Sequence, residues 1–291
     1  MSKVAIVTGS SSGIGLEAAA DLAAKGYNVV YACRNKEKAE AAIAEAVKRC
    51  PSAKTEFMQL DTGSMDSVKD FAKTFLAKYD RLDVLINNAG CGYFKSADRT
   101  TKDGLEAFFA TNYAGPWILT NKLLELLKKS SGRVVNVTSI EHWEGSYNFE
   151  KVVEKTGANS YATSKLMMML MAWELNNHGV KGIAVSPGAV NSGIWWYLRG
   201  IKKFFYKIML ALFFLTPKQG SEPLVFAATQ EDLPSNCYVT PYKQRGWCPY
   251  YSDMLGPFNG PTIGKPCPKA TKNGEAKKLW DFTAEKLKKF M

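Results

Sequence analysis

The sequence predicts a single α/β domain with a doubly wound parallel sheet and helices on both of its faces. Short apolar runs alternate with segments whose apolar residues recur at helical spacing, which is typical of right-handed strand–helix–strand crossovers. The chain has 291 residues, 46% of them hydrophobic and 22% charged, which is enough apolar material for a sizeable core. This composition argues against disorder, and no fixed-period repeat indicates a solenoid.

The alternation starts at the first residues and continues to about residue 186. Strands are expected at 4–7, 27–32, 55–60, 82–87, 133–138 and 182–186. Helices are expected at 13–25, 36–49, 64–78, 103–113, 116–129 and 161–176. The regular pattern stops after Ser192. Residues 194–215 are aromatic, apolar and rich in lysine, 234–268 are rich in Pro, Gly, Cys and Tyr, and 274–291 are typical of a basic amphipathic helix.

The start of the chain, its cysteines and its charge narrow the classes of function. Met1, Ser2 and Lys3 lead directly into the first apolar strand, so we expect no secretory signal and a cytoplasmic protein. The six cysteines are widely spaced, which favours reduced thiols, and no His or Cys spacing indicates a metal site. From Arg199 onward 15 Lys and Arg face 7 Asp and Glu, a surplus suited to anionic lipid or a phosphorylated cofactor. The sequence contains no zinc-finger, RRM or KH pattern, so no nucleic-acid partner is expected.

A glycine-rich turn joins the first strand to the first helix. Residues 8–15 read Thr-Gly-Ser-Ser-Ser-Gly-Ile-Gly, and glycines allow a close backbone approach to a phosphate. The helix that follows offers unpaired N–H groups and the positive end of its dipole. This context favours a dinucleotide pyrophosphate in a Rossmann-type fold over a simple turn. The candidate contacts are Gly9, Ser11, Ser12, Gly13, Ile14 and Gly15.

The end of the second strand indicates which dinucleotide binds. NAD sites place an acidic residue there, whereas this chain has Cys33 followed by Arg34 and Asn35. A guanidinium pairs with a 2′-phosphate that a carboxylate would repel, so NADP(H) is favoured. The alternative is that Arg34 is only a surface charge. Asp61, just past the third strand, suits either the adenine amino group or a loop and helix-capping role.

A phenol and an ammonium lie on one face of the helix at 161–176. Tyr161 and Lys165 are four residues apart, and a fixed cation beside a phenol favours its ionised form. Tyr161 could then take a proton from an alcohol or give one to a carbonyl. The alternative is a solvated surface pair.

Three further polar groups lie at strand ends or inside a helix. Ser139 follows a strand and could hold a substrate oxygen, or it could cap a turn. Asn112 interrupts a helical segment, where Asn is unfavourable unless its amide has a partner or faces water. Asn87–Gly90, Asn-Asn-Ala-Gly, ends another strand and could be an ordinary turn.

Taken together, these motifs resemble the short-chain dehydrogenase/reductase superfamily over residues 2–192. The resemblance implies a catalytic tetrad at Asn112, Ser139, Tyr161 and Lys165. In this family the Asn holds a water of a proton relay, and the Lys also binds the nicotinamide ribose. The resemblance assigns Asp61 to the adenine. It also adds Asn88, Ala89, Gly90, Pro187, Gly188, Val190 and Ser192 as cofactor contacts, with Ser192 standing where the family usually has Thr.

The chain looks most like the retinol dehydrogenase and retinol dehydrogenase-like branch. Ala32-Cys33-Arg34, the run 133–139, the long gap from Ser139 to Tyr161 and the segment 278–281 carry this likeness. In the superfamily the stretch after the Pro-Gly motif forms a substrate lid. Here it begins Ile194-Trp195-Trp196, the proposed substrate contacts, so a lipophilic aldehyde, ketone or alcohol is expected, retinoid or sterol among the options.

Residues 201–215 allow several interpretations. Lysines interleaved with Phe suit a helix lying in a membrane interface, and the uncharged run 208–215 is too short to cross a bilayer. We expect peripheral contact with the cytosolic face of an intracellular membrane or a lipid droplet. The alternatives are a lid that completes the core and an interface of a homo-oligomer.

These observations predict one domain with three parts. Residues 1–193 form the NADP-binding and catalytic core, 194–233 the lid and the helix after it, and 234–291 the Pro-rich segment and terminal helix. The predicted function is an NADP(H)-dependent oxidoreductase acting on CH–OH and C=O groups. The alternatives are a non-catalytic NADP(H) sensor or scaffold and a light-dependent enzyme like protochlorophyllide reductase.

Overall fold

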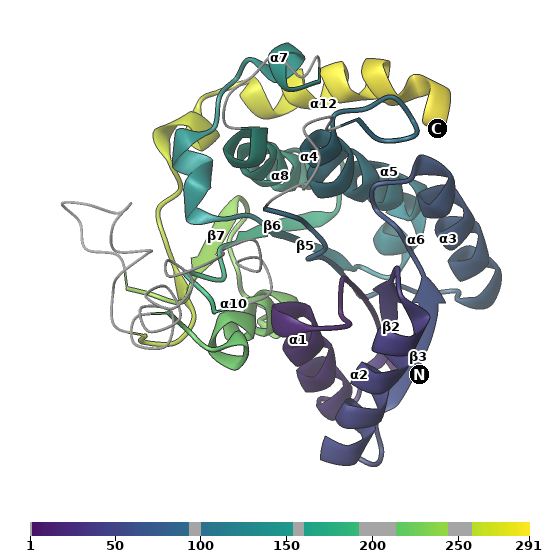
Figure 1. Ribbon diagram of the computed structural model, residues 1–291. Coiled ribbons are helices and arrows are strands. Elements are labelled where there is room, and N and C mark those ends of the chain that lie inside the picture. The colour runs from purple at the N-terminus through teal and green to yellow at the C-terminus, as the bar shows by residue number, and fades with distance from the viewer. Residues whose placement is uncertain (1, 93–99, 154–159, 192–213, 244–257) are drawn as a thin grey trace, which may run out of the picture.

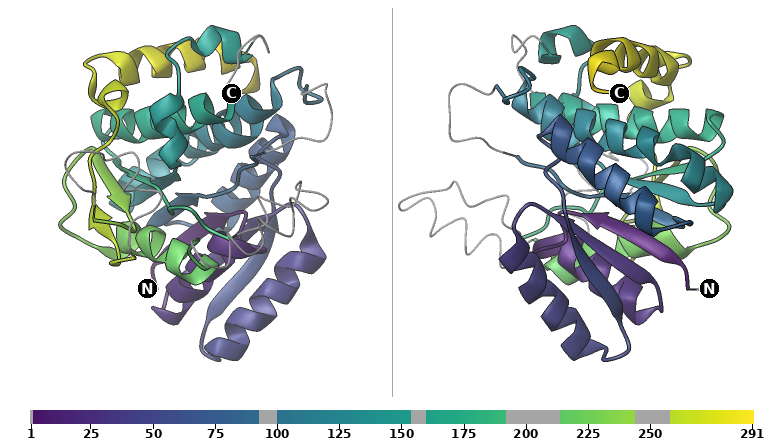
Figure 2. Two further views of the ribbon diagram at one scale, coloured as in Figure 1. Left: turned by 60° about the vertical axis from the view of Figure 1, so that its left-hand side comes forward. Right: turned by 90° about the vertical axis from the view of Figure 1, so that its right-hand side faces the viewer.

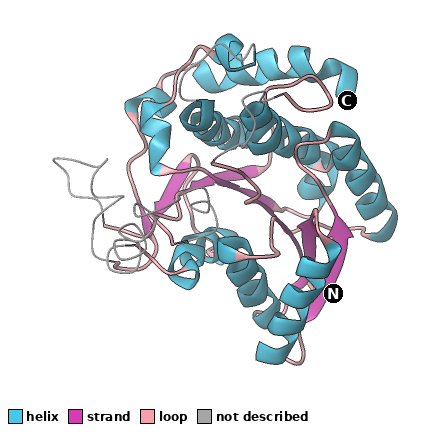
Figure 3. Cartoon of the chain, viewed as in Figure 1, coloured by secondary structure: helices cyan, strands magenta, loops and turns pink. Residues whose placement is uncertain are grey.

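The structure is a computed structural model that describes residues 2–92, 100–153, 160–191, 214–243 and 258–291. Its centre is an eight-stranded sheet in the order β3-β2-β1-β4-β5-β6-β7-β8, drawn as magenta arrows in Figure 3. The strands are β1 Val4–Thr8, β2 Asn28–Cys33, β3 Lys54–Gln59, β4 Val84–Asn87, β5 Arg133–Val137, β6 Lys181–Val185, β7 Cys237–Thr240 and β8 Thr262–Ile263.

The strand order reverses beside β1, which confirms the predicted doubly wound sheet. Each neighbouring pair from β3 to β7 is parallel, and only the β7–β8 pair among the described strands is antiparallel. In such sheets ligands bind outside the carboxyl ends of the strands where the order reverses. That crevice lies between β1 and β4.

Helices cover both faces of the sheet (Figures 1 and 2). One face carries α1 Gly13–Ala24, α2 Lys36–Arg49 and α10 Pro217–Thr229. The other carries α3 Met65–Lys78, α4 Ala107–Phe109, α5 Gly115–Lys122, α6 Leu124–Lys129 and α8 Ser160–Asn177. A further helix, α12 Glu275–Leu287, lies outside α8 as a third layer (Figure 1). The remaining helical turns are η1 Ala110–Ala114, η2 Ile140–Glu144, α7 Phe149–Val153, η4 Pro268–Thr271 and η5 Lys288–Phe290.

Two apolar cores, one on each face, follow from the period-two alternation of the strands. In β1, Val4 and Ile6 join the core beneath α3, α5 and α8, whereas Ala5 and Val7 join the core beneath α1 and α10. Burying strands on both sides requires the continuous apolar runs seen in the sequence. The sheet is therefore a rigid platform for the loops at its carboxyl edge.

Several predicted elements differ from the structure. The predicted helix at 103–113 begins only at Ala107, and residues 110–114 form a π-helix (η1). The predicted helix at 116–129 is divided at Leu123 into α5 and α6. Residues 234–268 contain two strands, β7 and β8, that the sequence pattern did not predict, because a four-residue strand in Pro-rich surroundings has too few periodic positions to stand out.

Candidate functional site

The glycine-rich turn and the Asn-Asn-Ala-Gly motif form one structure at the crevice. Thr8 Oγ1 accepts hydrogen bonds from the N–H groups of Asn88, at 3.0 Å, and Ala89, at 2.9 Å. The Asn88 Nδ2 donates to the Thr8 carbonyl at 2.8 Å. Because β1 and β4 are neighbours in the sheet, these bonds join two motifs that are 80 residues apart in the chain.

The turn fits a pyrophosphate by its shape and by its open helix end. Gly9 and Gly13 have φ angles of 68° and 60°, in the left-handed region that favours glycine. A Cβ on Gly15 would lie 2.4 Å from Asn88 Nδ2 and 2.6 Å from the Gly9 oxygen, so no side chain fits there. The N-cap Ser12 makes no side-chain capping bond, and the first turn of α1 has no acidic residue. The N–H groups and the dipole at this end are therefore available to an anion.

The polar residues expected near the adenosine of the cofactor make different contacts in the structure. Cys33 is buried, with its Sγ 3.4 Å from Ser10 Oγ, whereas Arg34, the residue directly after β2, is exposed. Asn35 Oδ1 accepts from the Lys38 N–H at 2.7 Å and caps α2, so its predicted contact with the cofactor stays a prediction. Asp61 Oδ1 accepts from the Gly63 N–H at 2.9 Å, while Ser64 is the actual N-cap of α3.

The amide of Asn112 is fully engaged inside the π-helix η1. Its Oδ1 accepts from the Cys91 N–H at 2.9 Å, and its Nδ2 donates to the Cys91 carbonyl at 3.1 Å and to Ser164 Oγ at 3.1 Å. These bonds explain why an Asn is tolerated in this helical segment. They fix the segment after Asn-Asn-Ala-Gly against α8, the helix that carries Tyr161 and Lys165.

Lys165 points from α8 toward the carboxyl end of β5. Its Nζ donates to the Val137 carbonyl at 3.0 Å, and the residue is only 5% exposed. A Cβ on Gly90 would lie 3.4 Å from this Nζ and 3.2 Å from Asn112 Oδ1. The absence of a side chain at Gly90 therefore allows the Lys165 ammonium and the Asn112 amide to approach the backbone there. Burial lowers the pKa of Lys165 to about 8.

Tyr161 lies beside both Lys165 and Ser139. The Lys165 Nζ is 5.6 Å from the centre of the Tyr161 ring, and the Phe108 ring packs edge-on against the same ring with centroids 6.1 Å apart. Burial, and then the Glu141 carboxylate, raise the pKa of Tyr161 above its ordinary value, while a hydrogen bond with Ser139 lowers it. The sequence predicted a lowered pKa. Burial of the phenol, the largest cause, decides the direction of the shift.

Ser139 is the N-cap of the 3-10 helix η2 and lies two residues after the end of β5. Its Oγ accepts from the Glu141 N–H at 3.3 Å, so the residue is also an N-cap, the alternative that its position in the sequence left open. Glu141 was not singled out from the sequence. The residue is exposed, yet partial desolvation of its carboxyl raises its pKa, and its charge acts on Tyr161 and Lys165. The available signal was its position two residues after Ser139.

The Pro-Gly motif closes the site beyond β6. Gly188 has a φ of 77°, and a Cβ there would lie 2.8 Å from Pro241. Val190 is buried and pairs with Leu215, whose N–H donates to the Ala189 carbonyl at 2.8 Å. Three predicted groups lie outside the described residues, namely Ser192, the substrate contacts Ile194, Trp195 and Trp196, and the membrane segment 201–215 except its last two residues.

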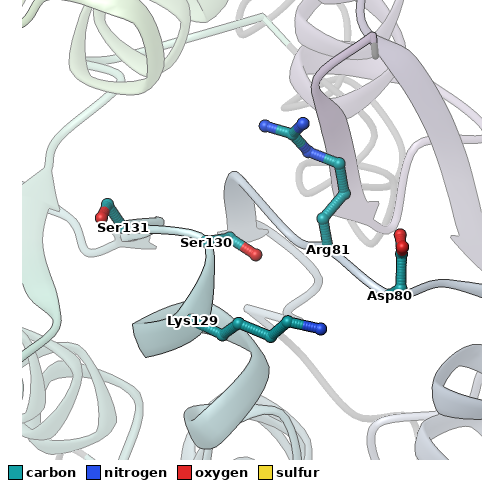
Figure 4. A pocket seen from close by; sticks show the side chains of 5 residues that line it. All are labelled: Asp80, Arg81, Lys129, Ser130 and Ser131. Carbon is teal, nitrogen blue, oxygen red and sulfur yellow. The ribbon is translucent and has the colours of Figure 1, made fainter.

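A surface hollow of about 290 Å³ lies at the end of the sheet where β4 and β5 begin, opposite to the end that carries the tetrad (Figure 4). It is lined by Asp80, Arg81, Lys129, Ser130 and Ser131, which precede β4 and β5. The tetrad follows the carboxyl ends of the strands, so this hollow is not part of the site. Over the described ranges, no cluster of three or more His, Cys, Asp or Glu could hold a metal ion, and no helix is long and apolar enough to cross a membrane.

Comparisons with known proteins agree with this geometry. A family model described as short chain dehydrogenase matches residues 3–200. Mouse retinol dehydrogenase 11 is 37% identical over 244 residues, covering 80% of this chain and 75% of that protein. Human polyprenol dehydrogenase is 34% identical over 245 residues, covering 79% of this chain and 74% of that protein. Mouse retinol dehydrogenase 13 is 31% identical over 296 residues, covering 97% and 83%.

Solved structures share the fold. A crystal structure of an uncharacterised protein from Mycobacterium paratuberculosis has a TM-score of 0.73 and 26% identity, covering 98% of this chain and 93% of that one. An alcohol dehydrogenase from the archaeon Thermococcus sibiricus, complexed with 5-hydroxy-NADP, has a TM-score of 0.61 and 24% identity, covering 81% and 92%.

Proposed function

The chain belongs to the short-chain dehydrogenase family of oxidoreductases and to its retinol dehydrogenase-like branch, and from that premise we propose that it uses NADP(H) to interconvert a lipophilic aldehyde or ketone and its alcohol. The convergence of the tetrad carries the proposal. Asn112 lies in η1, Ser139 is the N-cap of η2, and Tyr161 and Lys165 share α8, so three elements bring the four residues together beside the phosphate cradle.

The cofactor would lie across the crevice between β1 and β4. The cradle of Gly9, Gly13 and Gly15 would hold its pyrophosphate at the N-terminus of α1. Asp61 would accept from the adenine amino group. A bound nicotinamide supplies the hydride acceptor or donor.

Tyr161 is the proposed proton donor and acceptor. Because burial raises its pKa, the phenol keeps its proton at neutral pH, which suits donation to a carbonyl oxygen. The Ser139 hydroxyl, which is close enough to Tyr161 to lower its pKa, would stabilise charge that develops on that oxygen. Lys165 would bind the nicotinamide ribose and lower the free energy of the phenolate that forms when the proton leaves. Because its side-chain amide is engaged by Cys91 and Ser164, Asn112 would hold the water that returns the proton through its backbone.

The preference for NADP(H) over NAD(H) rests on Arg34. The residue is exposed directly after β2, where an acidic side chain would otherwise accept from the ribose 2′-hydroxyl. Its guanidinium could bind a 2′-phosphate with two hydrogen bonds.

The lipophilic substrate is supported by the site and by the relatives. Phe108 packs on the Tyr161 ring, so part of the wall beside the reacting oxygen is apolar. Relatives named for retinol and for polyprenol both act on long apolar alcohols by name.

We also propose that residues 201–215 contact a membrane peripherally and admit the substrate from lipid. This contact is tested by incubating the protein with anionic liposomes and pelleting them. The contact is contradicted if the wild type and the variants Ile208→Asp and Phe213→Asp remain in the supernatant to the same extent.

The central test is a turnover assay with a matched variant. Purified protein is titrated with NADPH by fluorescence and then mixed with a panel that includes retinal, sterol ketones and long-chain aldehydes, with absorbance at the NADPH band as readout. Tyr161→Phe should bind NADPH with unchanged affinity and lose about 100- to 10,000-fold in turnover, since one proton donor is removed. Full turnover by this variant would end the assignment, and turnover only under illumination would favour the light-dependent alternative.

A further inference from the structure

A segment near the C-terminus contacts the loop that carries Ser139. Residues 267–269, which we call the latch, follow β8 and lie against η2. The latch is beyond residues 3–200, the part matched by the family model. Three hydrogen bonds from the latch to η2 and to the residue after it carry the argument.

The first bond runs to His142, which is fully buried in the middle of η2. The Cys267 N–H donates to His142 Nε2 at 3.1 Å, and a backbone N–H can only donate. The neutral ring therefore carries its proton on Nδ1, which donates to the Ser139 carbonyl at 2.6 Å. One imidazole thus links the latch to the backbone of Ser139.

The other two bonds come from the Lys269 ammonium. Its Nζ donates to the carbonyls of Trp143 and Gly145, each at 2.8 Å, at the C-terminal end of η2. A cation suits this end because the last carbonyls of a helix lack partners and carry partial negative charge. The Tyr147 hydroxyl donates to the Lys269 carbonyl, which holds the latch from the other side.

The latch therefore restrains η2 at its centre and at its end, while Ser139 forms its beginning. The Ser139 hydroxyl accepts from the N–H of Glu141, the second residue of η2, and lies close enough to Tyr161 to lower its pKa, so its position depends on where η2 lies. A short 3-10 helix has weak internal hydrogen bonds and needs such outside support. A displacement of about 1 Å in a reacting group can cost on the order of 100-fold in rate.

We propose that Lys269 and His142 are positioning residues that hold the Ser139 hydroxyl toward Tyr161 for the reaction. This proposal rests on the proposed function for its catalytic consequence, and on the three latch bonds for its geometry. The residues touch neither substrate nor cofactor; they act through η2.

The test compares Lys269→Met with the conservative variant Lys269→Arg and with Lys277→Met. The Met side chain keeps the length and loses the ammonium, whereas Arg can still donate to both carbonyls. Lys277 is an exposed lysine of α12 that pairs with Asp281 and does not contact η2, so its variant controls for the loss of one charge. Tyr147→Phe removes the hydrogen bond to the Lys269 carbonyl and leaves the three residues of the latch unchanged.

We expect kcat of Lys269→Met to fall about 10- to 100-fold with unchanged NADPH affinity, Lys269→Arg to recover most of it, and Lys277→Met to match the wild type. Tyr147→Phe should show a smaller loss of the same kind. Amide hydrogen exchange of the peptide 139–147 should quicken in Lys269→Met and not in Lys277→Met.

Two results would overturn the proposal. One is wild-type kcat and wild-type exchange in Lys269→Met; the other is an equal loss of kcat in Lys277→Met, which would mean that charge alone matters. A wild type without turnover on any carbonyl, combined with faster exchange in Lys269→Met, would remove the proposed function and leave the latch in place. If Lys269→Met does not fold, the exchange and kcat of Tyr147→Phe decide.

Discussion

Gly15 is the position where a single methyl group should cause the greatest damage to the phosphate cradle. A Cβ built there lies 2.4 Å from Asn88 Nδ2 and 2.6 Å from the Gly9 oxygen. Ordinary contacts between such atoms exceed about 3 Å, so Asn88 and the glycine turn must move apart in Gly15→Ala. The bond from Asn88 Nδ2 to the Thr8 carbonyl, now 2.8 Å, lies directly in the path of that movement.

The magnitude follows from these two effects. Forcing a methyl group into a filled space costs about 1 to 3 kcal/mol. Leaving the Thr8 carbonyl without its donor costs about 1 to 3 kcal/mol more. The free energy of unfolding should therefore fall by about 2 to 6 kcal/mol, and because the turn can no longer close on a pyrophosphate, the NADPH dissociation constant should rise at least about tenfold, equivalent to about 1.4 kcal/mol.

Urea unfolding and fluorescence titration with NADPH measure these two quantities. Ser12→Ala is the matched control for stability, because Ser12 is the N-cap of α1 yet makes no capping bond, so its unfolding free energy should stay within about 0.5 kcal/mol of the wild type. Wild-type stability together with wild-type NADPH affinity in Gly15→Ala would refute the close approach on which the cradle is argued.

Two further predictions concern the coenzyme and acid stability. Arg34→Asp should shift the ratio of NADPH to NADH affinity toward NADH by about 10- to 100-fold, since a charged hydrogen-bond partner of the 2′-phosphate becomes a repelling carboxylate; an unaltered ratio would make Arg34 a surface charge only. For His142, burial lowers the pKa to about 4 from 6.5, so the unfolded chain binds more protons between these values and stability falls as the pH falls through that window. Urea unfolding at pH 7 and pH 4.5 should show a smaller loss in His142→Gln than in the wild type, and equal losses would contradict the neutral buried ring.

Local patterns in the sequence were sufficient for the first six strands of the sheet and for naming the candidate site residues. The apolar runs at 4–7 and 27–32 become β1 and β2 because buried parallel strands need apolar side chains on both faces. The glycine spacing and the Tyr161–Lys165 spacing are local as well, so a turn and one helix face could be inferred without knowing the fold. Asn112 could be noticed for a similar reason, since an amide in a helical segment needs a partner.

Only the tertiary structure decided what surrounds those residues. The direction of the Tyr161 pKa depends on burial and on Glu141, which are properties of the packed site and not of a four-residue spacing. The strand β7 forms because β6 offers an edge to pair with, and β8 then pairs with β7; neither forms because its own residues are periodic. The bond between Cys267 and His142 joins residues 125 apart, and no local pattern encodes a contact at that separation. Distances, burial and the partners of polar groups arise when distant segments meet, and these set the chemistry of the site.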